Sequence, residues 1–376
     1  MFNSKKSIYI LFILYISYAF SQITLPFTIV DQSKYSSSNL RHLEKIEVSE
    51  LGSHVLVVRV CFGNPPMCFS LKLSTSAIYS WVYASDEADY LYNPLKSTSF
   101  QGTRKSIKIF EGANTVKAKL IRDDITVEQY KILKMIFGIV SIEDPFSVHD
   151  SFGSLGLGFL SENEESSFLW QLYSTKQIEK RIFTIKFNSE DKGEVIFGKY
   201  PFDTVIPNQF KYRTCDALET KNQGEKNQRW ECPLNAIYLT SGGEEIFYSI
   251  NDRISFNLSS NILLFPADFY NRFVNQYFGN LLSINKCHNE GGVYFTKVVC
   301  EEGLNFQTLS DVTFIIGKWS IKFKPEDLFV VTPFFDYLEC VIKKHITLNA
   351  FILGSPFFKK HTVVFDKEKK QIGIFN

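Results

Sequence analysis

The stretch that decides the fold of this 376-residue chain is FSLKLSTSAIYSWV at residues 69–82, together with VRVCFGNPP just before it at 58–66. Apolar and polar residues alternate through much of both stretches, which is the pattern of half-buried β-strands. Gly63, Asn64 and the two prolines that follow form a turn signal between them. We therefore expect two paired strands joined by a tight turn.

A second copy of this pattern lies in the other half of the chain. A strand, a polar turn and an apolar run recur at residues 252–266, DRISFNLSSNILLFP. Each copy is followed far downstream by an apolar pair that ends in glycine, Leu155-Gly156 for the first and Leu353-Gly354 for the second. Two copies about 180 residues apart predict a duplicated β-lobe.

The rest of the chain also predicts strands. Runs rich in β-branched and aromatic residues, such as those at 106–110 and 181–187, follow one another at short spacing. Helices are expected only at 167–175 and, after a proline that suits a helix start, at 267–278. The predicted fold class is therefore all-β, with two lobes joined by an ordinary strand crossing near residue 200.

Composition excludes several classes of protein. Hydrophobic residues make up 45% of the chain and aromatic residues 15%, which is too apolar for a disordered protein. Lys and Arg number 41 against 40 Asp and Glu, so the net charge is only +1. A nucleic-acid partner is not expected, because binding phosphates requires an excess of positive charge.

The N-terminus predicts a secretory signal. Lys5 and Lys6 precede an apolar run at 8–20, and the small residues Ala19 and Ser21 suit cleavage, so residues 1–21 are interpreted as a signal peptide. A signal anchor is the weaker alternative, because a run of about 13 residues is short for a bilayer. Residues 22–50 are interpreted as an N-terminal lead-in with no clear propeptide. We expect a location outside the cell or in the lumen of the secretory pathway, including a lysosome- or vacuole-like compartment, and no membrane association after signal cleavage.

Seven cysteines are consistent with such an oxidising route. Three bridges are expected, Cys61–Cys68, Cys215–Cys232 and Cys300–Cys340. Cys287 is then left over, and Cys287–Cys300 is an equally allowed pairing. No Cys-x-x-Cys pair occurs, so no metal site is expected, and nothing in the sequence calls for a cofactor.

Taken in order, these landmarks resemble the pepsin-like aspartic protease family (peptidase family A1). Residues 63–66 are similar to its Gly-x-Pro-Pro turn, and 69–82 to its segment ending Asp-Thr-Gly-Ser-Ser-x-x-Trp-Val. Residues 153–159, GSLGLGF, resemble its Gly-Ile-Leu-Gly-Leu-Gly segment. The resemblance runs over about residues 50–376. It implies a bilobal acid-protease fold, with barrel-like lobes at 51–200 and 201–376 and a cleft between them.

The resemblance also locates the two catalytic positions, and neither holds an aspartate. Counting back from Trp81 places Ser74 at the first position, and counting back from Pro266 places Asn257 at the second. The family's chemistry needs two carboxylates that share one proton, one of which activates a water molecule. Neither a serine hydroxyl nor an asparagine amide can act as that base, so we expect no catalytic residues and no enzymatic activity.

Neighbouring positions differ as well. The glycines of the two loops are replaced by Ser76 and Ser259, and the threonine pair that bonds across the loops survives only as Thr75, opposite Leu258. The flap of the first lobe lacks its usual tyrosine, with Ile109 as the best match and Phe110 beside it. The residues expected at the cleft are Ser74, Thr75, Ser76, Ile109, Phe110, Asn257, Leu258 and Ser259.

Three functions remain open at this point. The leading hypothesis is a pseudoprotease whose cleft binds a peptide or protein, most simply as a monomer. The alternatives are an active aspartic-type endopeptidase, if the register is wrong or the mechanism unusual, and a purely structural or surface protein. Asn257-Leu258-Ser259 is also the only Asn-x-Ser/Thr sequon, a glycosylation candidate that we expect to be unused because it becomes buried on folding.

Overall fold

The computed structural model describes residues 22–31, 54–87, 90–111, 114–141, 153–159, 166–201, 212–218, 229–241, 244–292, 295–331 and 337–375. The predicted signal peptide lies outside these described residues, as does most of the predicted lead-in. The first part of the lead-in, Ile23–Asp31, forms strand β1. The chain is mainly β-structure, so the predicted fold class is confirmed.

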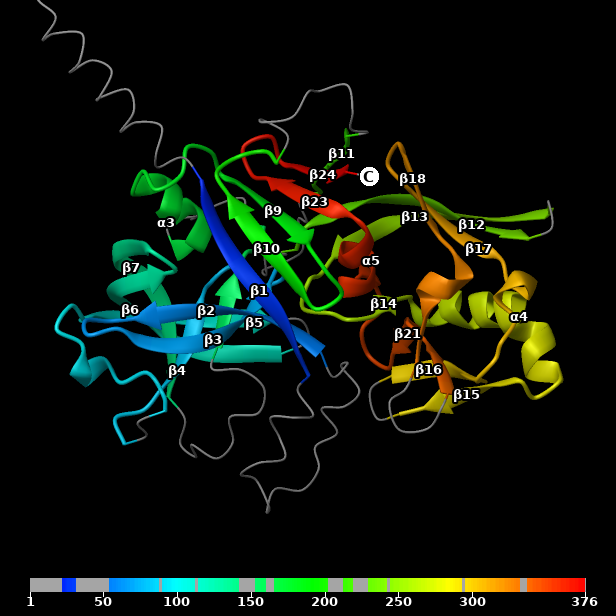
Figure 1. The fold of residues 1–376 in the computed structure, drawn as a ribbon, viewed down its shortest axis with the longest axis horizontal. Coiled ribbons are helices and arrows are strands. Elements are labelled where there is room, and N and C mark those ends of the chain that lie inside the picture. Colours follow the sequence, from blue (N-terminus) through cyan, green and yellow to red (C-terminus); the bar gives the residue numbers. More distant parts are fainter. Residues whose placement is uncertain are drawn as a thin grey trace, which may run out of the picture.

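A 13-stranded sheet contains most strands of the first half of the chain. Its members are β1 (Ile23–Asp31), β2 (His54–Phe62), β3 (Met67–Ser74), β4 (Trp81–Ala84), β5 (Gln101–Glu111), β6 (Asn114–Val127), β7 (Tyr130–Ser141), β8 (Gly153–Gly156), β9 (Ile182–Phe187), β10 (Lys192–Phe197), β11 (Tyr212–Asp216), β23 (Thr362–Asp366) and β24 (Gln371–Phe375). The last two strands of the chain thus belong to this sheet, because β23 pairs with β9. The red strands beside the green ones in Figure 1 show this joint.

An 11-stranded sheet contains the strands of the second half, on the right in Figure 1. Its members are β12 (Glu231–Ser241), β13 (Glu244–Phe256), β14 (Leu263–Leu264), β15 (Cys287–Gly291), β16 (Phe295–Glu301), β17 (Asp311–Ile316), β18 (Trp319–Phe323), β19 (Phe329–Val331), β20 (Tyr337–Cys340), β21 (Ile342–His345) and β22 (Phe351–Leu353). The two sheets together give the bilobal architecture that the sequence predicted.

The predicted duplication is visible in the pairing of four strands in each half. In the first, β3 is parallel to β8, β8 is antiparallel to β4, and β4 is parallel to β7. In the second, β13 is parallel to β22, β22 is antiparallel to β14, and β14 is parallel to β21. The two quoted stretches therefore occupy equivalent places, one in each half.

Helices cover only a small part of the structure. The two predicted at 167–175 and 267–278 are confirmed as α3 (Phe168–Ser174) and α4 (Ala267–Ser283). Ser167 begins α3, since its hydroxyl accepts a hydrogen bond from the backbone N–H of Trp170 at 3.2 Å. The other helical segments among the described residues are α5 (Ser355–Lys360) and the short 3-10 turns η2 (Pro94–Lys96), η6 (Phe306–Thr308) and η7 (Pro325–Leu328).

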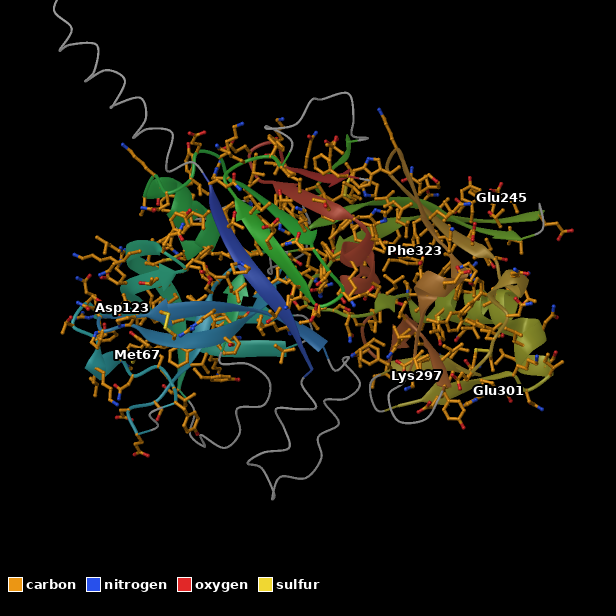
Figure 2. The ribbon with its side chains drawn as sticks, in the orientation of Figure 1. Met67, Asp123, Glu245, Lys297, Glu301 and Phe323 are labelled. Atoms are coloured by element: carbon orange, nitrogen blue, oxygen red, sulfur yellow. A yellow bond between two sulfur atoms is a disulfide. The ribbon has the colours of Figure 1, made fainter. Side chains whose placement is uncertain are left out.

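Aromatic side chains pack where the two halves meet. Trp230 is fully buried, and its ring centroid lies 5.0 Å from that of Phe365 on β23 and 5.9 Å from that of Phe183 on β9. Its indole N–H donates to the backbone oxygen of Leu157, just after β8, at 2.8 Å. Figure 2 shows the side chains of both halves and labels Asp123 on β6 in the first and Phe323 on β18 in the second.

Two of the three expected disulfides are confirmed, Cys61–Cys68 and Cys215–Cys232. The expected Cys300–Cys340 bridge is wrong, because the third bridge joins Cys287 to Cys300. These two residues face each other directly on the β15–β16 hairpin, whereas the partner of Cys300 on β20 is Leu338. Cys340 is a free, buried thiol, and burial raises its pKa to about 12.

No helix among the described residues is long and apolar enough to cross a membrane.

Candidate functional site

Two loops meet where the duplicated strands end. Ser74 is the last residue of β3 and pairs with Gly156 of β8, and Asn257 follows β13 directly. The backbone oxygen of Ser74 accepts a hydrogen bond from Leu157 at 2.7 Å, and the backbone N–H of Asn257 donates to Leu353 at 2.9 Å. Each loop is therefore held against the leucine-glycine segment of its own half.

Both glycines are required by close backbone packing. A Cβ atom at Gly156 would lie 2.6 Å from the backbone oxygen of Ile78. One at Gly354 would lie 2.3 Å from the backbone oxygens of Ser260 and Ile262. Any larger residue would push the loop away from its support, so these two glycines fix how closely the loops approach.

The side chain of Thr75 connects the two loops. Its buried hydroxyl donates to the backbone oxygen of Phe256 at 2.9 Å and accepts from the backbone N–H of Leu258 at 2.9 Å. The opposite residue, Leu258, is buried and has an apolar side chain that cannot return such bonds. The crosslink between the two loops is therefore made by the hydroxyl of Thr75 alone, without a matching side-chain bond from Leu258.

Three serine hydroxyls form a short chain across the same junction. Ser74 Oγ lies 3.1 Å from Ser76 Oγ and accepts from Ser259 Oγ of the other loop at 3.3 Å. It also accepts from the backbone N–H of Ala77 at 3.1 Å. Ser74 is fully buried and Ser76 nearly so, whereas Ser259 is partly exposed. Solvent therefore reaches this chain from the side of the second loop.

Asn257 is half-buried beside that chain. Its Oδ1 accepts a hydrogen bond from the backbone N–H of Ser259 at 3.0 Å, which is a local turn within the loop. An asparagine amide in such a turn orients the loop and leaves an N–H₂ group as a donor. The expected burial of this sequon is only partial, and the absence of a glycan on Asn257 stays a prediction.

The β5–β6 hairpin lies next to the first loop. Ile109 on β5 is fully buried and packs in one cluster with Ala77, Trp81 and Ala118. The side chain of Phe110 lies outside the described residues. Ile109 therefore supports the first loop from the hairpin as an apolar packing residue, and its assignment to the flap stays a prediction.

Buried carboxylates in the described part of the chain all lie in other interactions. They are Asp123, Asp124, Glu231 and Asp366. Asp123 accepts from Tyr92, Asp124 pairs with Lys131, Glu231 with Arg253, and Asp366 accepts from Tyr200. The groups that meet at the two loops are accordingly hydroxyls, an amide and backbone atoms.

Comparison with known proteins decides the family. The family model for eukaryotic aspartyl proteases matches residues 57–376. The chain belongs to this family. Pepsin II-1 of Oryctolagus cuniculus is 22% identical over 333 residues, covering 84% of this chain and 79% of that protein. Renin of Ovis aries is 18% identical over 329 residues, covering 83% and 78%.

A third aspartyl protease relative matches only part of the chain. Plasmepsin VIII of Plasmodium berghei (strain Anka) is 26% identical over 161 residues, which cover 40% of this chain and 43% of that protein. Sequence identities this low support a shared fold but not a shared chemistry at the site. The chemistry of this site therefore depends on its own residues.

The structure brings most of the sequence-predicted cleft residues together, since Ser74, Thr75, Ser76, Leu258 and Ser259 meet at the loop junction. Asn257 adjoins them in sequence.

Sequence reasoning missed Ser80 and Trp230. The hydroxyl of Ser80 accepts from the backbone N–H of Gly156 at 3.2 Å, and Trp230 fixes Leu157. Ser80 is close to Trp81 in sequence but carried no motif of its own, and Trp230 belongs to none of the motifs that the sequence showed.

Replacing Thr75 by valine should weaken the contact between the two halves. Valine has the shape of threonine but makes neither hydrogen bond, and the buried N–H of Leu258 loses its acceptor. We expect the free energy of unfolding to fall by about 2 kcal/mol, measured by urea denaturation.

The matched control for this prediction is Thr98→Val. Its hydroxyl donates to a backbone oxygen at 3.0 Å but is exposed to water, so we expect a change within about 0.5 kcal/mol. Equal unfolding midpoints for the two variants would show that Thr75 does not hold the loops together.

Proposed function

We propose that this aspartyl protease homologue does not hydrolyse peptide bonds, and that the region around Ser74 and Asn257 binds a peptide or protein segment. One observation carries the proposal: the two positions at which the family's motifs place aspartates hold a serine and an asparagine. The fold, the paired loops and the crosslink through Thr75 are retained around them.

The chemistry of these two residues supports the loss of catalysis. Peptide hydrolysis by this family needs a carboxylate to take a proton from water and a carboxyl group to polarise the substrate carbonyl. General base catalysis alone accounts for a factor of about 10²–10⁴. A serine hydroxyl does not ionise in the relevant pH range, and the oxygen of an amide is a poor base. Losing both carboxylates removes the route entirely.

A serine nucleophile is not a replacement. Ser74 Oγ is fully buried and already accepts hydrogen bonds from Ala77 and Ser259. A nucleophilic serine needs an adjacent base, usually a histidine, within hydrogen-bonding reach. Its hydrogen-bond partners within the described residues are hydroxyls and a backbone N–H, so its arrangement favours a structural role.

The exposed groups of the second loop are suited to peptide recognition. Asn257 and Ser259 are partly exposed and together offer amide and hydroxyl hydrogen-bonding groups. Such groups can pair with the N–H and C=O of an extended peptide, as in other sites where main-chain bonds supply the affinity. The proposed ligand therefore lies over the second loop and is recognised without being cut.

We further propose that the mature protein is secreted or resides in a lumen of the secretory pathway. Three disulfides among the described residues support this, because such bridges persist in oxidising compartments. The apolar run behind Lys5 and Lys6 supports it as well.

The test is proteolysis of a broad peptide library by the purified mature protein, from about pH 3 to pH 7. The variant Ser74→Asp/Asn257→Asp runs beside it. A second variant adds Ser76→Gly and Ser259→Gly, because those two hydroxyls lie against Ser74 Oγ. We expect no cleavage by the natural sequence and cleavage by the four-residue variant. Binding is followed with the same library by affinity selection.

Pepstatin-sensitive cleavage by the natural sequence, with loss of cleavage in Asn257→Ala, would contradict the proposal and favour the alternative of an active endopeptidase. No cleavage together with no retained peptide would favour the structural-protein alternative. The control for the binding arm is Leu95→Ala, on an exposed residue of η2 in a different part of the first lobe.

A further inference from the structure

The β5–β6 hairpin carries a dense group of exposed positive charges, three of which share one face. The side chains of Arg104, Lys105, Lys108, Lys117, Lys119 and Arg122 are all exposed. The first three belong to β5 and the last three to β6. The whole chain has a net charge of only +1, so this group is a local concentration and not part of a general excess.

The strand register places these charges side by side. Lys108 is directly opposite Lys117, and Lys119 is opposite Ser106. Like charges directly opposite each other on neighbouring strands are destabilising. The alternate residues, Ile109 and Ala118, are buried against the first loop, so Lys108, Lys117 and Lys119 share the opposite face of the hairpin.

Nearby acids do not neutralise the face within the part of the chain that the structure describes. None of the six cations forms an ion pair there. Asp123, next to Arg122, is buried and accepts from Tyr92 at 2.6 Å, and Asp124 is paired with Lys131 of β7 at 3.1 Å. The side chain of Glu111, at the end of β5, lies outside the described residues.

Among the residues that the structure describes, β5 is also the terminal strand of the 13-stranded sheet, and β6 is its partner there. It is 11 residues long, and one row of its backbone N–H and C=O groups faces away from β6. Lysines on such an edge often prevent unwanted pairing with other chains. That explanation covers the cations of β5 but not Lys117, Lys119 and Arg122, since β6 lies inside the sheet.

We propose that the hairpin docks an extended acidic polypeptide segment, which adds as a strand to the free edge of β5 and places alternate Asp or Glu side chains on the cationic face. Strand addition supplies the main-chain hydrogen bonds. Acidic residues at every second position fall about 6.6 Å apart on one face, which matches the spacing of side chains along β5 and β6. The segment is anionic because the face attracts carboxylates and repels basic side chains, whereas a neutral strand gains no attraction from the charges.

This surface is distinct from the proposed peptide site of the two loops. The buried face of the hairpin packs against Ala77 and Trp81, and Lys108, Lys117 and Lys119 lie on the opposite face. Binding at the hairpin is therefore independent of whether the two loops bind or cleave a peptide.

The experiment measures binding of a ten-residue peptide of alternating Glu and Thr to the purified mature protein, by fluorescence anisotropy at low and at high salt. We expect binding at low salt that weakens as salt rises, because exposed charges are screened. The variant Lys108→Gln/Lys117→Gln/Lys119→Gln should weaken binding about tenfold. The matched control, Lys176→Gln/Lys286→Gln/Lys318→Gln, removes the same charge from exposed lysines elsewhere and should bind normally.

Two N-methylated peptides test the strand geometry. Methylation of every Glu amide or of every Thr amide blocks one row of N–H groups, so one pattern should abolish binding and the other should retain it. Equal binding of both methylated peptides, or equal binding by the two triple variants, would overturn the proposal. Binding of a sulfated oligosaccharide without binding of the acidic peptide would also overturn it and assign the face to a glycan.

Discussion

Replacing Gly354 by alanine is expected to destabilise the protein by about 3 kcal/mol or more. The added Cβ would lie 2.3 Å from the backbone oxygens of both Ser260 and Ile262, a distance that real Cβ atoms essentially never show. Backbone atoms cannot rotate away as a flexible side chain can. The second loop must therefore leave its place beside β22, and with it Asn257, whose N–H bonds Leu353.

Urea denaturation of the purified variant, together with its soluble yield, measures this effect. Gly156→Ala is the equivalent change in the first half, where the Cβ would lie 2.6 Å from the backbone oxygen of Ile78, and we expect a similar loss. The control is Gly279→Ala in α4, where an added Cβ meets nothing within 4 Å. Alanine in a helix interior should stabilise by about 0.5–1 kcal/mol. A Gly354→Ala protein as stable as the parent would show that the two loops are not packed as described.

Replacing Asp123 by alanine is the second change with a large expected effect. Asp123 lies on β6 in the first half of the molecule (Figure 2) and is fully buried. Its carboxylate accepts from the hydroxyls of Tyr92 at 2.6 Å and Ser97 at 3.0 Å, from the hydroxyl of Ser99, and from the backbone N–H of Asp124. Burial, with the neighbouring carboxylate, raises the pKa of Tyr92, so its hydroxyl remains a donor.

Alanine at position 123 leaves these four donors without their acceptor inside the protein. We expect the free energy of unfolding to fall by about 3 kcal/mol or more, since each buried unsatisfied polar group costs about 1–3 kcal/mol. Thermal and urea unfolding of the variant measure the loss. Asp123→Asn, which keeps one acceptor oxygen, should lose less. Asp191→Ala is the exposed control, with one hydroxyl donor at 2.8 Å, and should change stability by about 0.5 kcal/mol or less. Equal stability of the Asp123 and Asp191 variants would refute the account.

Much of the fold could be predicted because its signals are local. The alternation at 58–66 and 69–82 and the proline before α4 each lie within a few residues of the structure they specify. Cys61 and Cys68 are correctly paired for the same reason, because the hairpin turn between them sets the register. The duplication was detectable because its two copies share an order of elements, not because their residues are alike.

The pairing of the third disulfide could not be predicted from local signals. Cys287, Cys300 and Cys340 are all buried in one half of the molecule, and sequence separation does not choose among them. The choice depends on which residues face each other across strands. Register puts Cys287 opposite Cys300 and leaves Cys340 opposite Phe329. A register is set by the packing of the whole sheet, which no single stretch of sequence contains.

The sequence by itself determined that the chain is an all-β protein with duplicated loops, and that Ser74 and Asn257 stand at the two equivalent positions. Only the tertiary structure decided that Ser259 bonds Ser74 across 185 residues, that Thr75 bonds Phe256 and Leu258, and that the last two strands complete the sheet of the first half. The physical reason is the distance along the chain over which each kind of interaction acts. Strand periodicity and turn chemistry act between neighbours in the chain, whereas these contacts join residues that come together only when both halves have folded and packed.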